Sequence, residues 1–332
     1  SPLAEVLHDA GLDIRGSDMA ESSNTLTLRE RGIPIHIGHS ADNVTDDISF
    51  VIRTAAVHDD NPEVHEAHRR GIPVFERTQA WGALMRGYQN ALCISGTHGK
   101  TTTTSMCTHI MMAAEKDPTV MIGGTLPLLK ACHRVGKGNT IIMESCEYYN
   151  SFLALNPTIA VVLNIEADHL DFFKDLEDIK HSFRCFAERV PAETGTVIAN
   201  YDDANTMDAL RGIARKVITF GLNAKADVYA QNIVHRGSVS EFDIYHRGNY
   251  FARVTLHVPG IHNVRNALAA TAAAIVLGVS PNAVKYGLAG FEGAGRRFDY
   301  KGKFQGADLY DDYAHHPSEL RALLDAVDTL NY

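Results

Sequence analysis

The chain has 332 residues, of which 45% are hydrophobic and 21% charged, as in an ordinary globular protein of two or three domains. Its formal net charge is -9, so we expect neither nucleic acid nor anionic lipid as a partner. The apolar runs are shorter than a membrane span. The five cysteines lack C-x-x-C spacing, which favours buried thiols in a reducing, cytoplasmic compartment.

Helical and extended patterns alternate along residues 1–90, which predicts a parallel sheet with helices on its faces. The predicted helices cover residues 3–10, 25–31, 61–70 and 79–86, and the predicted strands cover residues 12–15, 33–37, 48–52 and 72–75. Ligands bind beyond the carboxyl ends of such strands, where Asp18 lies. Its carboxylate either accepts hydrogen bonds from ribose hydroxyls or caps the next helix.

A phosphate-binding loop is predicted after the apolar strand 91–94. The loop reads Gly96-Thr97-His98-Gly99-Lys100-Thr101-Thr102, and the helix 105–114 follows it. Glycines let backbone N–H groups approach an anion, and the helix N-terminus adds partial positive charge. The lysine would contact terminal phosphates and the hydroxyl beside it would hold Mg²⁺. Because Ile94 stands where the longer consensus has its first glycine, an ordinary glycine turn remains the alternative.

Acidic and imidazole groups follow the next two apolar strands, 140–143 and 158–163. The first strand is followed by Glu144, and the second by Asn164-Ile165-Glu166-Ala167-Asp168-His169. Parallel strands end at one edge of a sheet, so these groups are expected beside the phosphate loop, as a site for Mg²⁺ bound to nucleotide. The alternative is that Asp168 caps a helix and His169 faces solvent.

The following segment continues the sheet and then changes its pattern. We predict a helix at 175–190, strands at 196–200 and 216–220, and antiparallel strands within 227–258. An alanine-rich helix then begins at residue 261, and Asn263 and Asn266 share one of its faces. The two amides either bind an adenine edge, or Asn263 caps the helix. A further helix is expected at 281–289.

Paired arginines follow in Gly295-Arg296-Arg297-Phe298-Asp299, either as a phosphate clamp or as plain surface charge. A short strand at 308–310, the run Asp311-Asp312-Tyr313-Ala314-His315-His316-Pro317 and a helix at 318–327 end the chain. One strand and one helix bury no core, so we expect residues 298–332 to begin a domain whose remainder is absent.

Taken in order, these motifs resemble those of the Mur ligases. The resemblance also includes Gly16-Ser17-Asp18, Gly38-His39-Ser40 and the stretch from Glu144 to Leu153, and it covers essentially the whole chain. It implies an α/β protein with a Rossmann-like UDP-sugar domain (1–90, first strand and glycine loop missing). A central P-loop ATPase domain with antiparallel strands (91–297) and the start of a third, Rossmann-like α/β domain (298–332) would follow.

The resemblance also implies a reaction of peptidoglycan precursor synthesis. ATP phosphorylates the lactyl carboxylate of UDP-N-acetylmuramate, and the amine of L-alanine attacks the acyl phosphate. The stretch from Glu144 to Leu153 is similar to that of the alanine-adding members. A member that adds a tripeptide to the same sugar, a nucleotide-binding module without ligase activity and a P-loop kinase are the alternatives. The protein is expected to be a monomer or a dimer.

Residue roles follow from the resemblance. Lys100, His169 and Arg297 would be catalytic, and Thr101, Glu144 and His169 would hold Mg²⁺. ATP would be bound by the loop residues 96–102 together with Asn263, Asn266, Arg297 and Asp312. Substrates would be bound by Ser17, Asp18, His39 and Ser40 for the UDP-sugar, and by Tyr313 and His315 for alanine. Several relatives carry a carbamylated lysine in the helix after His169, where this chain offers Lys180 and Arg184.

Overall fold

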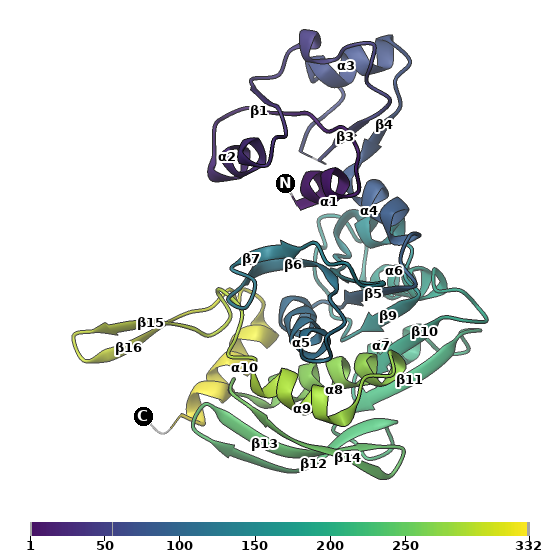
Figure 1. Ribbon diagram of the computed structural model, residues 1–332. Coiled ribbons are helices and arrows are strands. Elements are labelled where there is room, and N and C mark those ends of the chain that lie inside the picture. Colours follow the sequence, from purple (N-terminus) through teal and green to yellow (C-terminus); the bar gives the residue numbers. More distant parts are fainter. Residues whose placement is uncertain (1, 55, 331–332) are drawn as a thin grey trace. The chain divides into compact units, whose positions relative to one another are not determined.

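The computed structural model describes residues 2–54 and 56–330, and its α/β class confirms the prediction (Figure 1). The chain forms two compact units, one ending at Gly87 and the other beginning at Tyr88. Among the helices described, none combines the length and the apolar character that crossing a membrane requires.

The first unit contains two pairs of short parallel strands. Its elements are α1 (Pro2–Asp9), β1 (Gly16–Asp18), α2 (Ser23–Glu30), β2 (Ile35–Ile37), η1 (Ala41–Asn43), β3 (Val51–Arg53), α3 (Pro62–Arg69), β4 (Val74–Glu76) and α4 (Arg77–Met85). Strand β1 pairs with β2, and β3 pairs with β4. The strand predicted at 12–15 is wrong, because β2 has only three residues and its pairing with β1 begins at Gly16 opposite Ile35.

The second unit is built on a ten-stranded sheet of order β14-β13-β12-β11-β10-β9-β5-β8-β6-β7. The strands are β5 (Asn90–Ser95), β6 (Thr119–Leu126), β7 (Ala131–Arg134), β8 (Thr140–Glu144), β9 (Ile159–Val162), β10 (Thr196–Asn200), β11 (Lys216–Gly221), β12 (Val228–Arg236), β13 (Val239–His246) and β14 (Asn249–Leu256). Strands β12 to β14 are antiparallel to one another, as predicted. Strand β6 and its antiparallel neighbour β7 were not predicted.

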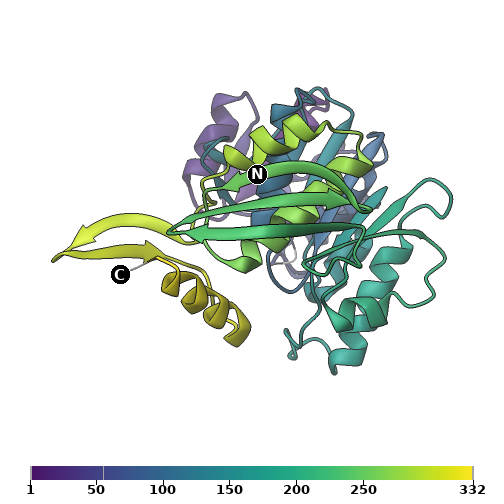
Figure 2. The same ribbon diagram turned by 90° about the horizontal axis from the view of Figure 1, so that it is seen from below.

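Helices pack on the sheet and on one another. They are α5 (Lys100–Ala113), η2 (Tyr148–Ala154), α6 (Leu176–Glu188), α7 (Ala204–Ala209), α8 (Ile261–Val276) and α9 (Pro281–Ala289). Figures 1 and 2 show the β12–β14 strands curling beneath α8 and α9, where their apolar side chains join the main core. Helix α9 lies directly against α5, since a Cβ on Gly287 would come within 2.5 Å of the Ile110 Cα.

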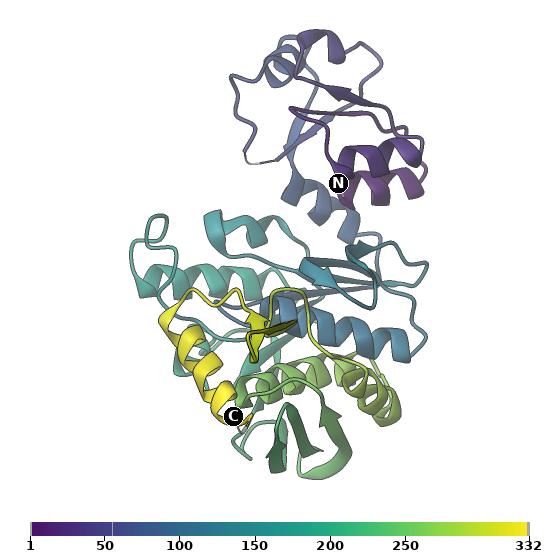
Figure 3. The ribbon, with the colours of Figure 1, turned by 90° about the vertical axis from the view of Figure 1, so that its left-hand side faces the viewer.

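The last segment adds a hairpin and a helix. Strands β15 (Asp299–Phe304) and β16 (Ala307–Asp311) pair in antiparallel fashion, and α10 (Pro317–Asp328) follows them. The strand predicted at 308–310 is present, but its partner β15 was not foreseen. Helix α10 runs beside the start of α8, where the Ala326 methyl lies 3.1 Å from an ideal Cβ on Gly260 (Figure 3). This placement brings the last segment close to the phosphate loop.

Candidate active site

The glycine-rich loop between β5 and α5 has a backbone that requires its two glycines. Gly99 caps α5 with φ 84°, in the left-handed region. Gly96 has φ 145°, and a Cβ there would lie 2.8 Å from the Leu163 Cβ. Asn164 ties the loop to the end of β9, because its Oδ1 accepts from the His98 N–H at 2.7 Å and its Nδ2 donates to the His98 carbonyl at 3.0 Å. A helix N-terminus preceded by such a loop can bind phosphate.

Lys100 is held at this loop by three groups. Its Nζ donates to the carbonyl oxygens of Gly96 at 2.5 Å and Thr97 at 3.1 Å, and it forms an ion pair with Glu147 at 3.0 Å. Burial would lower the pKa of Lys100, but the neighbouring acidic groups, Glu147 foremost with Cys146 and Glu144, together outweigh it and the pKa is raised. The ammonium is therefore positively charged. Sequence analysis did not identify Glu147, whose side chain is 3% exposed, as its partner.

Thr101 and Glu144 come together beside the loop. Thr101 is in the first turn of α5, and Glu144 is the last residue of β8, the strand next to β5. The Thr101 hydroxyl donates to Glu144 Oε1 at 3.0 Å, and the Gly123 N–H donates to Oε2 at 2.6 Å. The parallel register of β5 and β8 pairs Ile94 with Glu144, which brings the carboxylate to the loop. A hydroxyl and a carboxylate are oxygen donors of the kind that Mg²⁺ prefers, so these residues fit the ion.

His169 lies next to Glu147, with its Nε2 4.0 Å from Glu147 Oε1. Its ring stacks on Tyr148 with centroids 4.3 Å apart, and its φ of 51° is in the left-handed region. Asp168 caps no helix: its Oδ1 accepts from the His169 N–H at 2.7 Å, while Asp175 caps α6. That alternative for Asp168 is therefore wrong.

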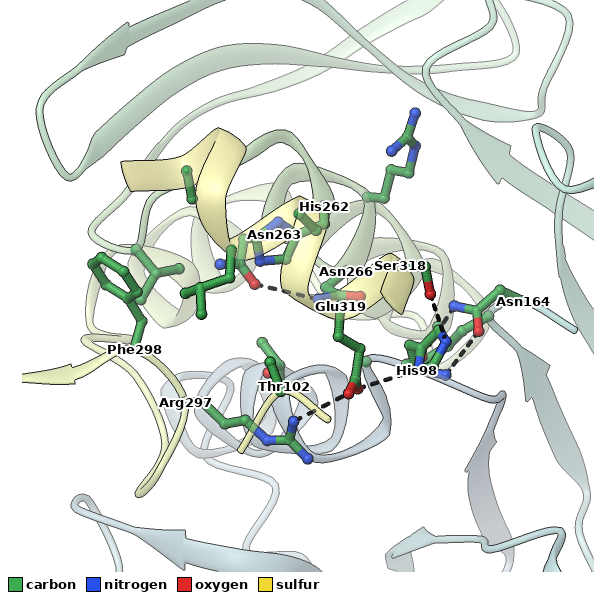
Figure 4. Close-up of a pocket in the computed structure, with 18 of the residues that line it drawn as sticks. His98, Thr102, Asn164, His262, Asn263, Asn266, Arg297, Phe298, Ser318 and Glu319 are labelled. Carbon is green, nitrogen blue, oxygen red and sulfur yellow. Dashed lines mark hydrogen bonds and ion pairs between the residues drawn. The ribbon is translucent and has the colours of Figure 1, made fainter. Parts of the chain in front are cut away.

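A cavity of about 320 Å³ lies between the phosphate loop, the start of α8 and the last segment (Figure 4). Asn263 and Asn266 are nearly buried in its wall, and Asn266 Nδ2 donates to Asn263 Oδ1 at 3.2 Å. Gly260 occupies the N-cap position of α8, so helix capping by Asn263 is wrong. The two amides are placed to hydrogen-bond a planar polar ligand in the cavity.

Arg297 and Asp312 line the same cavity from the last segment. The Arg297 guanidinium lies 3.9 Å from Glu319 Oε1 and 5.3 Å from the centroid of the Tyr313 ring. Asp312 accepts hydrogen bonds at 2.7 Å from the N–H groups of Phe298 and Ala314. Burial would raise the pKa of Glu319, but the hydrogen bond and charge of His98 and the backbone N–H groups of His315 and His316 together outweigh it and lower the pKa to about 2.

Tyr313 and His315 lie close together, with ring centroids 5.0 Å apart. The Tyr313 ring is 46% exposed and lies under the Arg296 guanidinium at 4.7 Å. His315 Nδ1 is 3.5 Å from Glu319 Oε2. This group presents an aromatic face, cations and a carboxylate, which suit a zwitterionic ligand.

In the first unit, Ser17 and His39 meet around a carboxylate that sequence analysis missed. The Ser17 hydroxyl donates to Glu63 Oε2 at 2.6 Å, and His39 Nδ1 lies 3.1 Å from the same atom. Ser40 caps η1 instead, accepting from the Asp42 N–H at 3.2 Å. Asp18 ends β1 and accepts weakly from the Ala20 N–H at 3.4 Å.

Two models of one protein family match this chain. Residues 94–274 match the family model described as the Mur ligase middle domain, and residues 1–89 match that described as the Mur ligase family catalytic domain. The chain belongs to the Mur ligase family. This confirms the family predicted from the sequence, and members of the family are ATP-dependent ligases.

Relatives of this Mur ligase include two named UDP-N-acetylmuramate–L-alanine ligase. One, from Agathobacter rectalis, is 46% identical over 98% of this chain and 71% of its own length. The other, from Caldicellulosiruptor bescii, is 43% identical over the same shares. Among solved structures, a UDP-N-acetylmuramate–alanine ligase from Thermotoga maritima matches with a TM-score of 0.80 and 31% identity, covering 98% of this chain and 75% of that one.

A tripeptide ligase also has this fold. The structure of a UDP-N-acetylmuramate:L-alanyl-γ-D-glutamyl-meso-diaminopimelate ligase from Neisseria meningitides matches with a TM-score of 0.77 and 25% identity, covering 88% of this chain and 94% of that one. In α6, the helix after His169, Lys180 donates to Glu177 at 2.7 Å and to Asp208 at 3.2 Å. These hydrogen bonds raise the pKa of Lys180, which keeps its amine protonated.

Proposed function

We propose that this Mur ligase joins L-alanine to the lactyl carboxylate of UDP-N-acetylmuramate at the expense of ATP. The observation that carries the proposal is the charged Lys100 at a phosphate loop whose adjoining cavity is lined by Asn263 and Asn266. The alanine-adding relatives, 43–46% identical, support alanine as the amine substrate. The predicted cytoplasmic location and the monomer or dimer state remain predictions.

The residues near the loop would act by positioning and electrostatics. Lys100 would stabilise charge on the transferring phosphoryl group and on the oxygens of the acyl phosphate. To do so it exchanges its ion pair with Glu147 for one with phosphate. Arg297 would add a second positive charge from the last segment, and Asp312 would orient the nucleotide. No covalent bond to the protein is needed.

Mg²⁺ would be held by Thr101 and Glu144, with His169 contributing to a second ion near the reacting carboxylate. The oxygen donors of Thr101 and Glu144 already meet at 3.0 Å, which is the observation that favours them. When bound, the ion neutralises phosphate charge and orients the phosphate oxygens. Within the described residues, His169 contacts Glu147 and Asp168 rather than Glu144, so it would serve the second ion and not the one at Thr101 and Glu144.

Each of the three proposed regions would bind a different substrate. Residues 1–90 would bind the UDP-sugar through Ser17, Asp18, His39 and Ser40, and residues 91–297 would bind ATP. The last segment, from residue 298, would belong to a third domain that contributes Tyr313 and His315 to the alanine site. Support comes from the cluster of Tyr313, His315 and the two arginines, which offers groups for both a carboxylate and an ammonium.

Two experiments test the proposal. In calorimetric titrations of the whole chain, we expect a non-hydrolysable ATP analogue with Mg²⁺ and UDP-N-acetylmuramate to bind separately. Lys100→Ala should abolish analogue binding, while the exposed Lys116→Ala serves as the matched control. In the second experiment, phosphate release is measured with alanine and with the tripeptide.

The outcomes separate the alternatives. Preference for the tripeptide would show that the chain is a tripeptide-adding ligase and not an alanine-adding one. Analogue binding that is equal in the Lys100→Ala and Lys116→Ala variants would refute the phosphate-loop assignment. Binding of both ligands with no amide product, even when the chain is extended to the length of its relatives, would favour a nucleotide-binding module.

A further inference from the structure

A second cluster of side chains that could hold a metal ion lies at the phosphate loop, and it shares no residue with Thr101 and Glu144. His98 comes from the loop, Glu166 from the segment after β9, and His316 from the N-cap of α10. One donor atom from each residue lies within 4.8 Å of the other two. Three segments distant in sequence therefore present two imidazoles and a carboxylate to one point (Figure 4 shows His98 beside Ser318 and Glu319).

The distances fit a tetrahedral cation. Glu166 Oε2 is 3.5 Å from His98 Nε2 and 3.6 Å from His316 Nδ1. Zinc binds imidazole nitrogen and carboxylate oxygen at about 2.0–2.2 Å, so neighbouring ligands around a tetrahedral ion lie roughly 3.3–3.6 Å apart. The two distances from Glu166 Oε2 already agree with this spacing, so these ligand atoms would hardly have to move to bind the ion.

The orientation of His98 is set by a second carboxylate. Its Nδ1 lies 3.1 Å from Glu319 Oε1, and Glu319 is largely buried. An N–H donated from Nδ1 to Glu319 leaves the lone pair on Nε2, directed toward Glu166 and His316. Ligand histidines in zinc sites are commonly oriented by a carboxylate in this way.

The Ser318 hydroxyl oxygen lies at the point where the three candidate ligand atoms converge. It lies 2.8 Å from Glu166 Oε2, 3.0 Å from His98 Nε2 and 2.7 Å from His316 Nδ1. A hydroxyl has a single proton to donate, so with His98 in the tautomer set by Glu319 it cannot satisfy both Glu166 Oε2 and His98 Nε2, whichever tautomer His316 adopts. A cation at this point would satisfy both of them, and the lone pair of His316 Nδ1 as well, with the Ser318 side chain rotated aside.

We propose that His98, Glu166 and His316 form a binding site for a divalent transition-metal ion of the Zn²⁺ class, separate from the Mg²⁺ site at Thr101 and Glu144. Imidazole donors favour zinc over magnesium, which prefers oxygen. The bound ion would join the phosphate loop to the N-terminus of α10, and would exchange the weak 3.4 Å bond from the Ser318 N–H to His316 Nδ1 for a metal bond. This inference goes beyond the proposed ligase activity.

The test is Zn²⁺ binding by the whole, chelator-treated chain, measured by competition with a chromophoric chelator in excess Mg²⁺. We expect a single tight site that His316→Gln removes. Glu319→Gln should weaken it about 10- to 100-fold, the usual cost of losing the group that orients a ligand. Ser318→Ala should bind at least as tightly as the parent chain, and His257→Gln, an exposed histidine elsewhere, should be unchanged. Co²⁺ in place of Zn²⁺ should give the intense visible absorption of tetrahedral coordination.

Binding that is absent from the parent chain would overturn the proposal. So would binding that survives both His316→Gln and Glu319→Gln while their circular dichroism spectra are unchanged. If His316→Gln fails to fold because the α10 cap is lost, the comparison of Glu319→Gln with Ser318→Ala decides. Equal weakening in these two variants would indicate a hydrogen-bonded cluster and contradict a metal site.

Discussion

Replacement of Gly123 by alanine tests the metal-binding role of Glu144 without altering any proposed ligand. A Cβ on Gly123 would lie 2.4 Å from Glu144 Oε1 and 2.8 Å from its Cδ. Cβ contacts below 3.0 Å essentially never occur. The carboxylate must therefore move by at least about 0.6 Å, the difference between this limit and the 2.4 Å contact with Oε1. The Gly123 backbone is outside the left-handed region, so alanine itself is tolerated there.

The displaced carboxylate would lose the hydrogen bonds from the Gly123 N–H and the Thr101 hydroxyl. Loss of such supporting bonds typically costs about 10- to 100-fold in metal affinity, which is about 1.4–2.7 kcal/mol. We therefore expect the Mg²⁺-dependent part of the affinity for a non-hydrolysable ATP analogue to fall by this factor in Gly123→Ala. Calorimetric titrations at increasing Mg²⁺ concentrations measure it directly.

The neighbouring glycine supplies the control. A Cβ on Gly124 would lie 3.3 Å from Thr101 Cγ2 and 3.6 Å from the Gly295 carbonyl, which small adjustments accommodate. Gly124→Ala should keep nearly all of the Mg²⁺-dependent affinity. If the two variants fold and bind the analogue equally well at every Mg²⁺ concentration, Glu144 is not a metal ligand and the reasoning is refuted.

Three further predictions concern the loop and the core. Lys100→Met removes the lysine partner of the buried Glu147 carboxylate and should lower the free energy of unfolding by about 3–5 kcal/mol, part of which Glu147→Gln restores in the double variant. Gly99→Ala combines φ 84° with a Cβ 2.6 Å from Asn266 Oδ1 and should abolish analogue binding. Burial lowers the pKa of His109 to about 4, so the unfolded chain takes up the proton as the pH falls below about 6.5 and stability decreases. His109→Gln should reduce the stability lost between about pH 7 and pH 5 by about 1–2 kcal/mol.

Thermal unfolding at matched pH measures the first and third predictions, and calorimetry measures the second. Lys116→Met is the control for Lys100→Met, and no recovery in the double variant with Glu147→Gln would contradict an ion-pair origin. Gly212→Ala has a similar backbone strain, φ 69° with nothing within 4 Å, and should keep full analogue binding. An identical pH profile in His109→Gln would assign the acid sensitivity to other histidines.

Local patterns predicted the strand, glycine turn and helix around Gly96 and Gly99, because this geometry depends on glycines and a helix N-terminus that are adjacent in sequence. The partner of Lys100 was missed, because the pair forms only when η2, with Tyr149 and Asn150 in the left-handed region, turns Glu147 back toward the loop. Strand β6 was missed because the glycine pair within it resembles a turn. The strand predicted at 12–15 failed since pairing register depends on a partner about twenty residues away.

The contact between Gly287 and Ile110 has a mechanical consequence. An ideal Cβ on Gly287 would lie 2.5 Å from Ile110 Cα, so at this position no side chain separates the backbones of α9 and α5, and neither helix can slide past the other without a clash. Helix α5 begins at the phosphate loop, and the chain leaving α9 leads within a few residues to Arg297. A displacement of the loop on phosphate binding would thus be passed through α5 and α9 toward the segment that carries Arg297.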